Sequence, residues 1–386
     1  MSHPRGSSII GLILRNASHP AVADAGSISP APGPILLVRL GAVGDVIRAL
    51  PALDLLRRTF PDASVDWLVE ERCADVLQGH PDLRQVLTFR RKALVRAASR
   101  LRLLTSYREL RRTLTGLGEA RYHTVVDLQG TLKSALLSRA TGCPVRIGLA
   151  AGHAKESAHR FYTQCVEPRR ERMSRVERNF QLLSPLGVDP GKQPRPRARL
   201  SLSETHRAWA ESVLASLAPA HRPRVLLYPG TSRRQAYKRW PAERFGFLAG
   251  RLHDDGVQVL IAGGPGEEEL IRAACEAATT PPAVVPSSDL CQLAAVLQGV
   301  DLFVGGDTGP MHLAWAAGTR VLGLFGATDP VVNAPYDAHR SGHRVLYAGP
   351  ESRPYRVKGE QARQWMEAIS LDDVHHACGE MVQPRR

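Results

Sequence analysis

The sequence lacks several features that would place the protein in a special class. Its six cysteines form no CxxC pair, so they indicate neither a zinc ribbon nor a redox motif. No run of about 20 apolar residues occurs, so a transmembrane helix is not expected. Aromatic residues make up only 5% of the 386 residues, yet 43% are hydrophobic, which excludes wholesale disorder and a fibrous repeat. The chain is therefore expected to be a globular protein of two or three domains, with free thiols in a reducing cytosol.

Acidic residues are also scarce. The chain has 37 Asp and Glu residues against 51 Lys and Arg residues, which gives a formal net charge of +14. This excess indicates a negatively charged partner or substrate, and nucleic acid, anionic lipid and phosphorylated metabolites all remain open. Much of the excess lies between Arg84 and Arg112, where ten basic residues stand against the single acid Glu109. This segment is either a solvated helix face or a surface for an anionic ligand.

The first 34 residues differ in composition from the rest. An apolar run at residues 9–14 is closed by Arg15 and is at the short limit for the core of a secretory signal. The stretch that follows is rich in Ser, Pro, Gly and Ala, which is typical of a flexible segment. We expect residues 1–34 to form a flexible leader.

From residue 35 onward, short β-branched or leucine-rich runs alternate with helical patterns, which is typical of βαβ units and parallel sheets. The alternation stops around residues 187–197, where Pro, Gly and charged residues without periodicity indicate a linker. We expect an N-terminal domain at 35–190, a linker at 191–200, a C-terminal domain at 201–350 and a helical tail at 351–386. The expected strands are 35–40, 65–69, 86–89, 124–128, 145–148, 225–228, 257–262, 302–304 and 321–325, and the clearest helices are 241–253 and 289–298.

The first expected strand runs into a glycine-containing turn. Gly41 and Gly44 lie between strand and helix, and Asp45 lies near the start of the helix, where free N–H groups can meet a ligand. The spacing fails as a dinucleotide fingerprint, because the third glycine is missing and no acidic residue is expected to end the next strand. Asp45 is then either a helix cap or a general base at a strand end. Pro51 predicts a kink or a short first turn in the helix pattern.

Polar side chains follow the strands of the second half. Thr231, Ser232 and Lys238 come after the strand at 225–228, and such a set either holds a diphosphate or forms a solvated basic loop. A glycine-rich turn then leads into three consecutive glutamates. They favour a helix N-terminus without any ligand, although one of them could also accept hydrogen bonds from the hydroxyls of a ribose. In the segment after residue 304, Asp307 and Thr308 precede a helix with Pro310 in its first turn. The free N–H groups there predict an anion site.

His312 lies one turn into this last helix. It is either a core histidine bonded to Asp307 or part of the anion site.

Five segments, in this order and spacing, resemble the lipopolysaccharide heptosyltransferases of glycosyltransferase family 9, and the resemblance covers about residues 35 to 348. The segments are VRLGAVGDVIRALPAL, DLQGTLKSALLSR, YPGTSRRQAYKRWP, GGPGEEE and GGDTGPMHLAWAAG. The sequence Trp67-Leu-Val-Glu-Glu and the single lysine of the Tyr-Lys-Arg-Trp-Pro loop favour the heptosyltransferase I type. The resemblance implies an α/β fold of the GT-B class, with two Rossmann-like doubly wound domains facing across a cleft. It also implies inverting, metal-independent transfer of heptose from ADP-heptose to Kdo on lipid A, with no cofactor.

The resemblance also assigns roles to residues. It implies that Asp45 is the catalytic base and that Gly44, Gln129 and Lys133 contact the acceptor. The polybasic segment, with Arg90, Arg91 and Lys92, is expected to attract the anionic lipid acceptor at the inner face of the bacterial inner membrane. The donor-binding residues implied by the resemblance are Thr231, Ser232, Lys238, Glu267, Asp307, Thr308, Gly309 and His312.

Alternatives from other classes remain. A family 9 transferase could act on another glycan or on a protein. A basic α/β protein could instead bind nucleic acid, although the polybasic segment shows no aromatic interleaving and no helix-turn-helix or RNA-binding signature. A dehydrogenase is disfavoured by the failed fingerprint. We therefore expect a cytoplasmic enzyme, peripheral to the membrane, that binds no nucleic acid.

Overall fold

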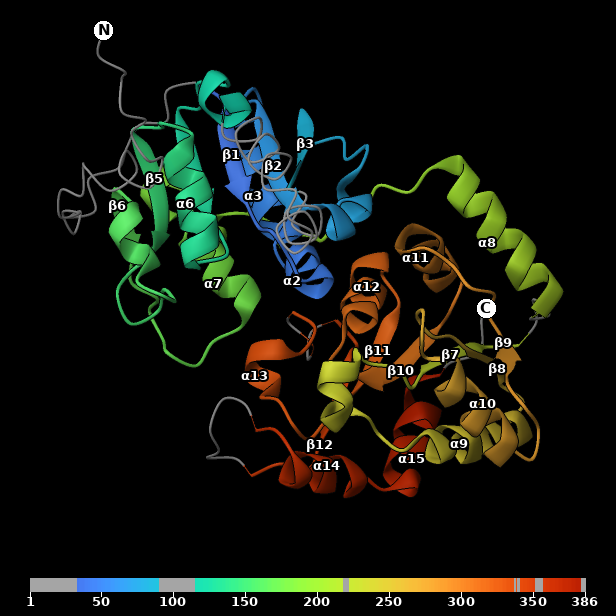
Figure 1. Cartoon of the computed structure of the whole chain (residues 1–386). Coiled ribbons are helices and arrows are strands. Elements are labelled where there is room, and N and C mark those ends of the chain that lie inside the picture. Colours follow the sequence, from blue (N-terminus) through green and yellow to red (C-terminus); the bar gives the residue numbers. More distant parts are fainter. Residues whose placement is uncertain are drawn as a thin grey trace, which may run out of the picture. The chain divides into compact units, whose positions relative to one another are not determined.

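A computed structural model describes residues 33–89, 115–217, 222–336, 338, 341–350 and 357–382. Most of the expected leader and the residues Arg90, Arg91 and Lys92 lie outside these described residues. The described chain forms two compact units (Figure 1). Unit 1 comprises the described residues of Met1–Gly41, Pro51–Glu171 and Glu177–Pro196, and unit 2 comprises those of Ala42–Leu50, Arg172–Val176 and Arg197–Arg386.

Unit 1 is built on a six-stranded parallel sheet in the order β3-β2-β1-β4-β5-β6. Every residue of β1, β2 and β4 is buried, as the apolar runs of these strands require when helices cover both faces. The strands are β1 (Ile35–Val38), β2 (Val65–Glu70), β3 (Gln85–Phe89), β4 (Thr124–Asp127), β5 (Val145–Leu149) and β6 (Gln164–Val166). The helices of its sequence range are α3 (Leu50–Thr59), α6 (Leu132–Ala140) and α7 (Arg175–Gln181), with the 3-10 turns η1 (Glu71–Cys73), η2 (Asp75–Leu77), η3 (Ala158–Phe161), η4 (Ser184–Leu186) and η5 (Pro190–Lys192).

Unit 2 is built on a second six-stranded parallel sheet in the order β12-β11-β10-β7-β8-β9. Its strands are β7 (Arg224–Tyr228), β8 (Gln258–Ile261), β9 (Ala283–Val284), β10 (Leu302–Gly306), β11 (Arg320–Phe325) and β12 (Arg344–Tyr347). Its helices are α2 (Val43–Ile47), α8 (Glu204–Leu217), η6 (Arg233–Lys238), α9 (Ala242–Asp254), α10 (Glu268–Ala277), α11 (Leu290–Gln298), α12 (Gly309–Ala317), α13 (Pro330–Asn333), α14 (Glu360–Glu367) and α15 (Leu371–Met381).

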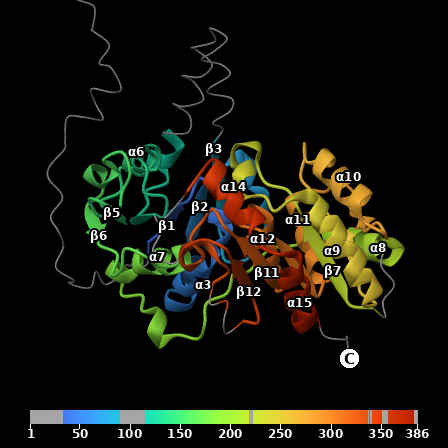
Figure 2. The same cartoon turned by 90° about the horizontal axis from the view of Figure 1, so that it is seen from below.

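Helices cover both faces of the unit 2 sheet. Figure 1 shows α11 and α12 above the strands and α9, α10 and α15 below them, and Figure 2, seen from below, shows α9 and α15 lying over the strands. The lower layer contains a buried core in which Trp240 and Phe245 pack edge to face at 5.0 Å between ring centroids. The C-terminal helices α14 and α15 contribute Met366 and Cys378 to this core, so they are an integral part of unit 2.

The two sheets share one topology. Counted within each unit, both have the strand order 3-2-1-4-5-6 of dinucleotide-binding folds. In such sheets the strand order reverses between the first and fourth strands, and ligands bind beyond the carboxyl ends of the strands at that switch point. The switch point lies between β1 and β4 in unit 1 and between β7 and β10 in unit 2.

All nine expected strands and both expected helices are present, with ends shifted by up to two residues. The sequence did not indicate β6, β9 and β12, because these are short edge strands without a fully buried residue. Near Pro51, where a kink or a short first turn is expected, the helix pattern is interrupted between the short helix α2, which ends at Ile47, and α3, which begins at Leu50. One expectation is wrong, since Glu70 does end β2, where its carboxylate binds Lys133 and Arg72.

The boundaries of the units differ from a simple division at residues 191–200. The chain does pass from unit 1 to unit 2 between Pro196 and Arg197, but two earlier segments, Ala42–Leu50 and Arg172–Val176, also belong to unit 2. The first of them joins unit 2 because α2 packs on α12. In the described part of the chain, no helix is both long and apolar enough to cross a membrane.

Candidate functional site

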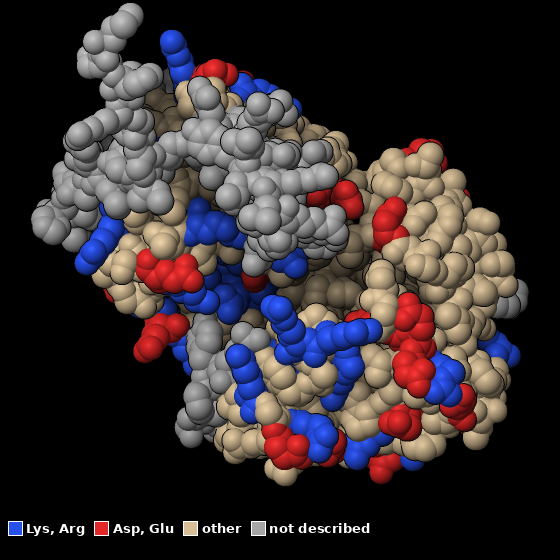
Figure 3. Space-filling view, viewed as in Figure 1, with Lys and Arg blue, Asp and Glu red and all other residues tan. Residues whose placement is uncertain are grey.

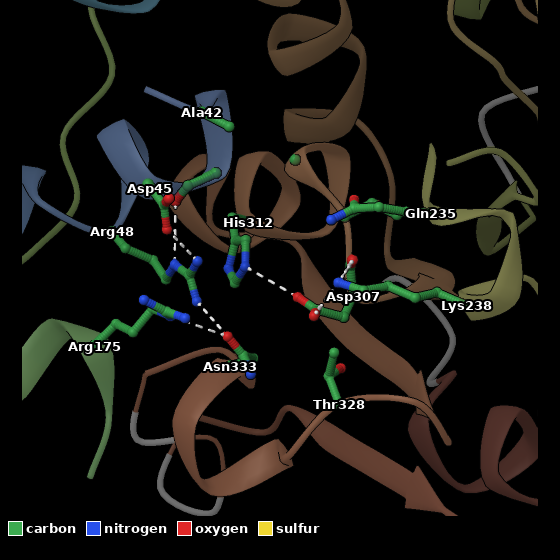
Figure 4. Close-up of a pocket in the computed structure, with 13 residues that line it drawn as sticks. Ala42, Asp45, Arg48, Arg175, Gln235, Lys238, Asp307, His312, Thr328 and Asn333 are labelled. Atoms are coloured by element: carbon green, nitrogen blue, oxygen red, sulfur yellow. Dashed lines mark hydrogen bonds and ion pairs between the residues drawn. The ribbon is translucent and has the colours of Figure 1, made fainter. Parts of the chain in front are cut away.

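A polar pocket opens in unit 2 at the carboxyl ends of β7 and β10, the switch point of its sheet (Figure 4). Most of its lining residues are charged or can form hydrogen bonds. They come from α2, from the segment Arg172–Val176, from η6, from the turn between β10 and α12, and from the region of α13. The lining residues are Ala42, Gly44, Asp45, Arg48, Arg175, Gln235, Lys238, Asp307, Thr308, Gly309, His312, Thr328 and Asn333.

Asp45 reaches the pocket from the first turn of α2. The interpretation of Asp45 as a helix cap is wrong, because the N-cap is Ala42 and makes no side-chain cap bond. The close packing of α2 on α12 requires a glycine at position 44. A Cβ atom there would lie 2.7 Å from Cδ2 of His312 and 3.4 Å from the Cα of Gly309. In the sequence Gly44-Asp45, the glycine therefore allows α2 and α12 to pack closely, and the next residue places its carboxylate in the pocket.

The start of α12 forms another wall. Thr308 is the N-cap in extended conformation, and Pro310 follows in the first turn, where its missing N–H costs nothing. The hydroxyl of Thr308 is buried and has no hydrogen-bond partner in the described part of the chain. The first N–H groups of a helix also lack intrahelical acceptors. This wall therefore offers several unused polar groups and the positive end of a helix dipole.

Lys238 and Asp307 form a buried ion pair in the pocket. The Nζ atom of Lys238 lies 2.8 Å from a carboxylate oxygen of Asp307, and the two side chains are 8% and 9% exposed. Burial alone would raise the pKa of Asp307, but the charge of Lys238 and the contact with His312 hold that pKa below its usual range. Asp307 is therefore ionised at neutral pH and fixes the ammonium group of Lys238.

His312 lies at the centre of the pocket in Figure 4. Its Nε2 atom is 3.7 Å from Asp307, too far for a hydrogen bond, and neither ring nitrogen has a hydrogen-bond partner among the described residues. Burial, with the charge of Arg48, lowers its pKa from 6.5 to about 4. The imidazole is therefore neutral at pH 7, with one donor and one acceptor available to a ligand.

Three further side chains form a network beside Asp45. Arg48 contacts a carboxylate oxygen of Asp45 at 2.5 Å, the carbonyl oxygen of Gly44 at 3.3 Å and the amide oxygen of Asn333 at 3.1 Å. Arg175 donates its Nε–H to the same oxygen of Asn333 at 3.2 Å. The spacing of Asp45 and Arg48 on one helix could have indicated their pairing. Arg175 and Asn333 gave no such signal, because only the fold brings residues 158 positions apart together.

Seven of the residues singled out in the sequence thus meet in this pocket, whereas three candidate donor residues do not line it. Thr231 follows β7, is buried, and donates its hydroxyl to the carbonyl of Gln235 at 3.1 Å. Ser232 is exposed beside it. The carboxylate of Glu267, at the N-cap of α10, accepts from the N–H of Gly264 at 2.7 Å. Their loops follow the neighbouring strands β7 and β8, so they lie at the same edge of the sheet as the pocket.

A group of Lys and Arg side chains lies on the surface of unit 2 around η6 (Figure 3). This turn carries Arg233, Arg234 and the buried Lys238. Such a surface attracts anions toward the pocket.

The candidate acceptor residues Gln129 and Lys133 lie in unit 1. The side-chain oxygen of Gln129 accepts from the N–H of Leu40 at 3.2 Å. Lys133 lies on α6 and binds the carboxylate of Glu70 at 2.5 Å. Burial would raise the pKa of Glu70, but the contacts with Lys133 and Arg72 lower it. The other candidate acceptor residues, Arg90, Arg91 and Lys92, lie outside the described residues.

Comparison with known proteins gives a consistent result. Residues 110–358 match the model of glycosyltransferase family 9 (heptosyltransferase). The chain is 32% identical over 308 residues to lipopolysaccharide heptosyltransferase 1 of Pseudomonas aeruginosa, a match that spans 78% of this chain and 81% of the relative. It is also 24% identical over 348 residues to lipopolysaccharide heptosyltransferase 3 of Escherichia coli, spanning 88% of this chain and 96% of the relative.

A solved structure, the E. coli heptosyltransferase WaaC with ADP, is 25% identical, with a TM-score of 0.71 over 90% of this chain and all of that one. This likeness and the two parallel sheets confirm the expected fold class, an α/β fold of the GT-B type with two Rossmann-like units.

Proposed function

This chain belongs to glycosyltransferase family 9, the heptosyltransferases, and we propose that it transfers heptose from ADP-heptose to Kdo on lipid A. The observation that carries the proposal is one pocket that holds the carboxylate of Asp45, the ammonium of Lys238 and the start of α12. A transfer between a nucleotide sugar and a hydroxyl needs these three elements: a base for the acceptor and two groups for the departing diphosphate.

In the proposed reaction, the acceptor hydroxyl attacks the anomeric carbon of the heptose while Asp45 takes the hydroxyl proton. The bond between that carbon and the phosphate oxygen breaks, the configuration inverts, and ADP leaves with the electron pair. The negative charge that develops on the diphosphate is stabilised by Lys238 and by the N–H groups at the start of α12. Neutral His312 and the hydroxyl of Thr308 supply further hydrogen bonds to the donor.

Arg48 orients the base. Its guanidinium is buried, and its three nitrogens bind three different acceptors, so it cannot rotate without losing bonds. The contact with Arg48 holds the carboxylate of Asp45 in the pocket, and a carboxylate can accept a proton.

The remaining donor contacts are assigned by position. Thr231 and Ser232 follow β7, and we propose that their hydroxyl and backbone N–H groups bind the diphosphate. Glu267 follows β8, and we propose that its carboxylate accepts hydrogen bonds from the ribose. In support, Gly230 leaves the space that this carboxylate occupies, since a Cβ atom there would lie 1.9 Å from an oxygen of Glu267.

The acceptor is proposed to be Kdo on lipid A, as for a heptosyltransferase of type I. The support is the identity of 32% to a relative named lipopolysaccharide heptosyltransferase 1. Another relative is named lipopolysaccharide heptosyltransferase 3, so the experiment below distinguishes Kdo-lipid A from a heptosylated core as acceptor. Gln129 and Lys133 are proposed acceptor contacts, supported by their position at the carboxyl edge of the unit 1 sheet.

The decisive experiment is a mass measurement. The purified protein is incubated with ADP-heptose and Kdo-lipid A, and the product should gain the mass of one heptose while ADP is released. A chelator should not reduce the rate, because the proposed leaving-group contacts are protein groups rather than a metal. Transfer to an already heptosylated core instead of Kdo-lipid A would contradict the type I assignment. A strict requirement for Mg²⁺ would contradict the mechanism.

The enzyme is proposed to work in the cytoplasm at the inner face of the inner membrane. The support is the excess of basic residues between Arg84 and Arg112, since each basic residue near an anionic surface contributes roughly 1 kcal/mol. Changing Arg90, Arg91 and Lys92 to Glu should abolish binding to anionic vesicles and raise the acceptor KM, while ADP affinity stays the same. Tight, salt-sensitive binding of oligonucleotides without sugar transfer would overturn the assignment in favour of a nucleic-acid-binding protein.

A further inference from the structure

Two guanidinium groups meet on a single neutral oxygen in the pocket. The amide oxygen of Asn333 accepts from Arg48 at 3.1 Å and from Arg175 at 3.2 Å, so both of its lone pairs are used. The amide nitrogen of Asn333 donates to the carbonyl of Asp329 at 3.1 Å, which fixes the orientation of the amide. The arrangement brings two positive charges together around a group that neutralises neither of them.

The two arginines differ in whether a carboxylate neutralises their positive charge. Arg48 is paired with the carboxylate of Asp45. Arg175 donates its Nε–H to Asn333. Its two Nη nitrogens have no hydrogen-bond or ion-pair partner in the described part of the chain. Among the described residues that line the pocket, the acidic side chains are Asp45 and Asp307 and the side chains with a formal positive charge are Arg48, Arg175 and Lys238, which leaves one formal positive charge in excess.

The unused end of Arg175 is suited to a carboxylate. When Nε is engaged, the two Nη nitrogens still form a planar fork that matches the two oxygens of a carboxylate. The same pocket holds a second group suited to a ligand, because both ring nitrogens of His312 lack partners among the described residues and the side chain is 2% exposed. A buried polar group without a partner is costly unless a ligand supplies one.

The position of Arg175 indicates which substrate carries the carboxylate. Figure 4 shows Arg175, Arg48 and Asp45 on one side of His312 and Lys238 on the other. If Asp45 removes the proton from the acceptor hydroxyl, an anion at Arg175 lies on the acceptor's side of the reaction, while the diphosphate of the donor lies toward Lys238.

We propose that Arg175, held by Asn333, binds the carboxylate of the acceptor sugar acid and so selects an acidic sugar over a neutral one. The inference rests on the proposed function, since it takes the acceptor to be a sugar acid and Asp45 to be the base. It adds a specificity-determining residue whose role is independent of the donor.

The test compares an acceptor acid with its neutral analogue. A Kdo glycoside is used as the free acid and as the carboxamide, which has the same shape but no charge. For Arg175→Gln, kcat/KM for the acid should fall about 10–100-fold, the loss of a charge-assisted fork, while kcat/KM for the amide stays the same. Arg175→Lys should recover part of the preference for the acid. Arg170→Gln, a control that removes an exposed charge outside the pocket lining, should behave like the wild type.

Two results would overturn the inference. An equal loss for acid and amide means that Arg175 only supports the fold of the pocket. A loss of ADP affinity, measured by calorimetry, means that its anion is the diphosphate of the donor.

Failure of the proposed function is recognised separately. If the wild type transfers heptose to no Kdo acceptor, binding of the free acid and the amide is measured by calorimetry with saturating ADP. A preference for the acid in the wild type that disappears in Arg175→Gln supports the carboxylate site on its own. Equal binding of acid and amide, or no binding of either, refutes it.

Discussion

The two units have the same strand order, but the polar groups at their switch points differ in the hydrogen bonds that they make. In unit 1, the polar groups at the carboxyl ends of β1 and β4 bind one another. Gln129 accepts from the N–H of Leu40, and Asp127 accepts from the hydroxyl of Tyr162 at 2.7 Å and from two backbone N–H groups. Lys133 is paired with Glu70. These polar groups at the edge therefore form hydrogen bonds and an ion pair with other parts of unit 1.

At the corresponding edge of unit 2, some buried hydrogen-bonding groups have no partner among the described residues. The ring nitrogens of His312 and the hydroxyl of Thr308 are buried without partners among the described residues. The comparison shows that topology alone does not identify a binding site. The same strand order supplies a place for a ligand in both units. Buried donors and acceptors that have no partner among the described residues indicate that the place in unit 2 is suited to a polar ligand.

The comparison predicts its largest effect at Asp45. Asp45→Asn keeps the size of the side chain and an acceptor for Arg48 but removes the base. The turnover number should fall about 10²–10⁴-fold, the usual cost of losing a general base, with little change in ADP affinity. Asp127→Asn is the matched change at the edge of unit 1, and it should reduce stability rather than turnover of the protein that remains folded. Turnover of Asp45→Asn above a few per cent of wild type would remove Asp45 from the mechanism.

The second effect is expected at Lys238. Removing its ammonium in Lys238→Ala should weaken ADP binding by roughly 1–3 kcal/mol, the loss of a charge-assisted bond to the diphosphate. The change also leaves the buried carboxylate of Asp307 without its cation. The double variant Lys238→Met with Asp307→Asn removes both charges and serves as the control for stability. Calorimetry measures the affinity for ADP in both variants. If that affinity is unchanged in both, Lys238 does not bind the diphosphate.

Much of this arrangement can be predicted from the sequence, because the signals are local. The apolar runs that form β1, β7 and β10 and the turns that end them put Asp45, Lys238 and Asp307 at strand ends, where parallel sheets bind ligands. What could not be predicted depends on contacts between distant segments. Nothing near Asn333 in the chain indicates that it joins Arg48 to Arg175, and nothing in the linker indicates that two earlier segments belong to unit 2.

A smaller effect is expected in unit 1. The hydroxyl of Tyr162 satisfies the buried carboxylate of Asp127, and the ring fills space that only a glycine at position 148 leaves open. Tyr162→Phe should lower the free energy of unfolding by about 1–2 kcal/mol, because the carboxylate loses a partner in a buried site. ADP affinity should not change. A loss of ADP binding without a loss of stability would contradict the view that the pair Tyr162 and Asp127 is structural.

The last effect concerns the pH dependence set by His312. Its pKa is about 4 in the folded protein and 6.5 as an ordinary value, so the unfolded chain binds a proton first as the pH falls. The stability that the neutral imidazole contributes is therefore fully present above pH 6.5 and is lost as the pH falls toward 4. The slope from this one group is at most about 1.4 kcal/mol per pH unit. Denaturant unfolding between pH 4 and 7 should show that slope in the wild type and a shallower one in His312→Gln, whereas His253→Gln, at an exposed position of α9, should keep it. Equal slopes in all three proteins would mean that folding does not lower the pKa of His312, and the effect ascribed here to its burial would be wrong.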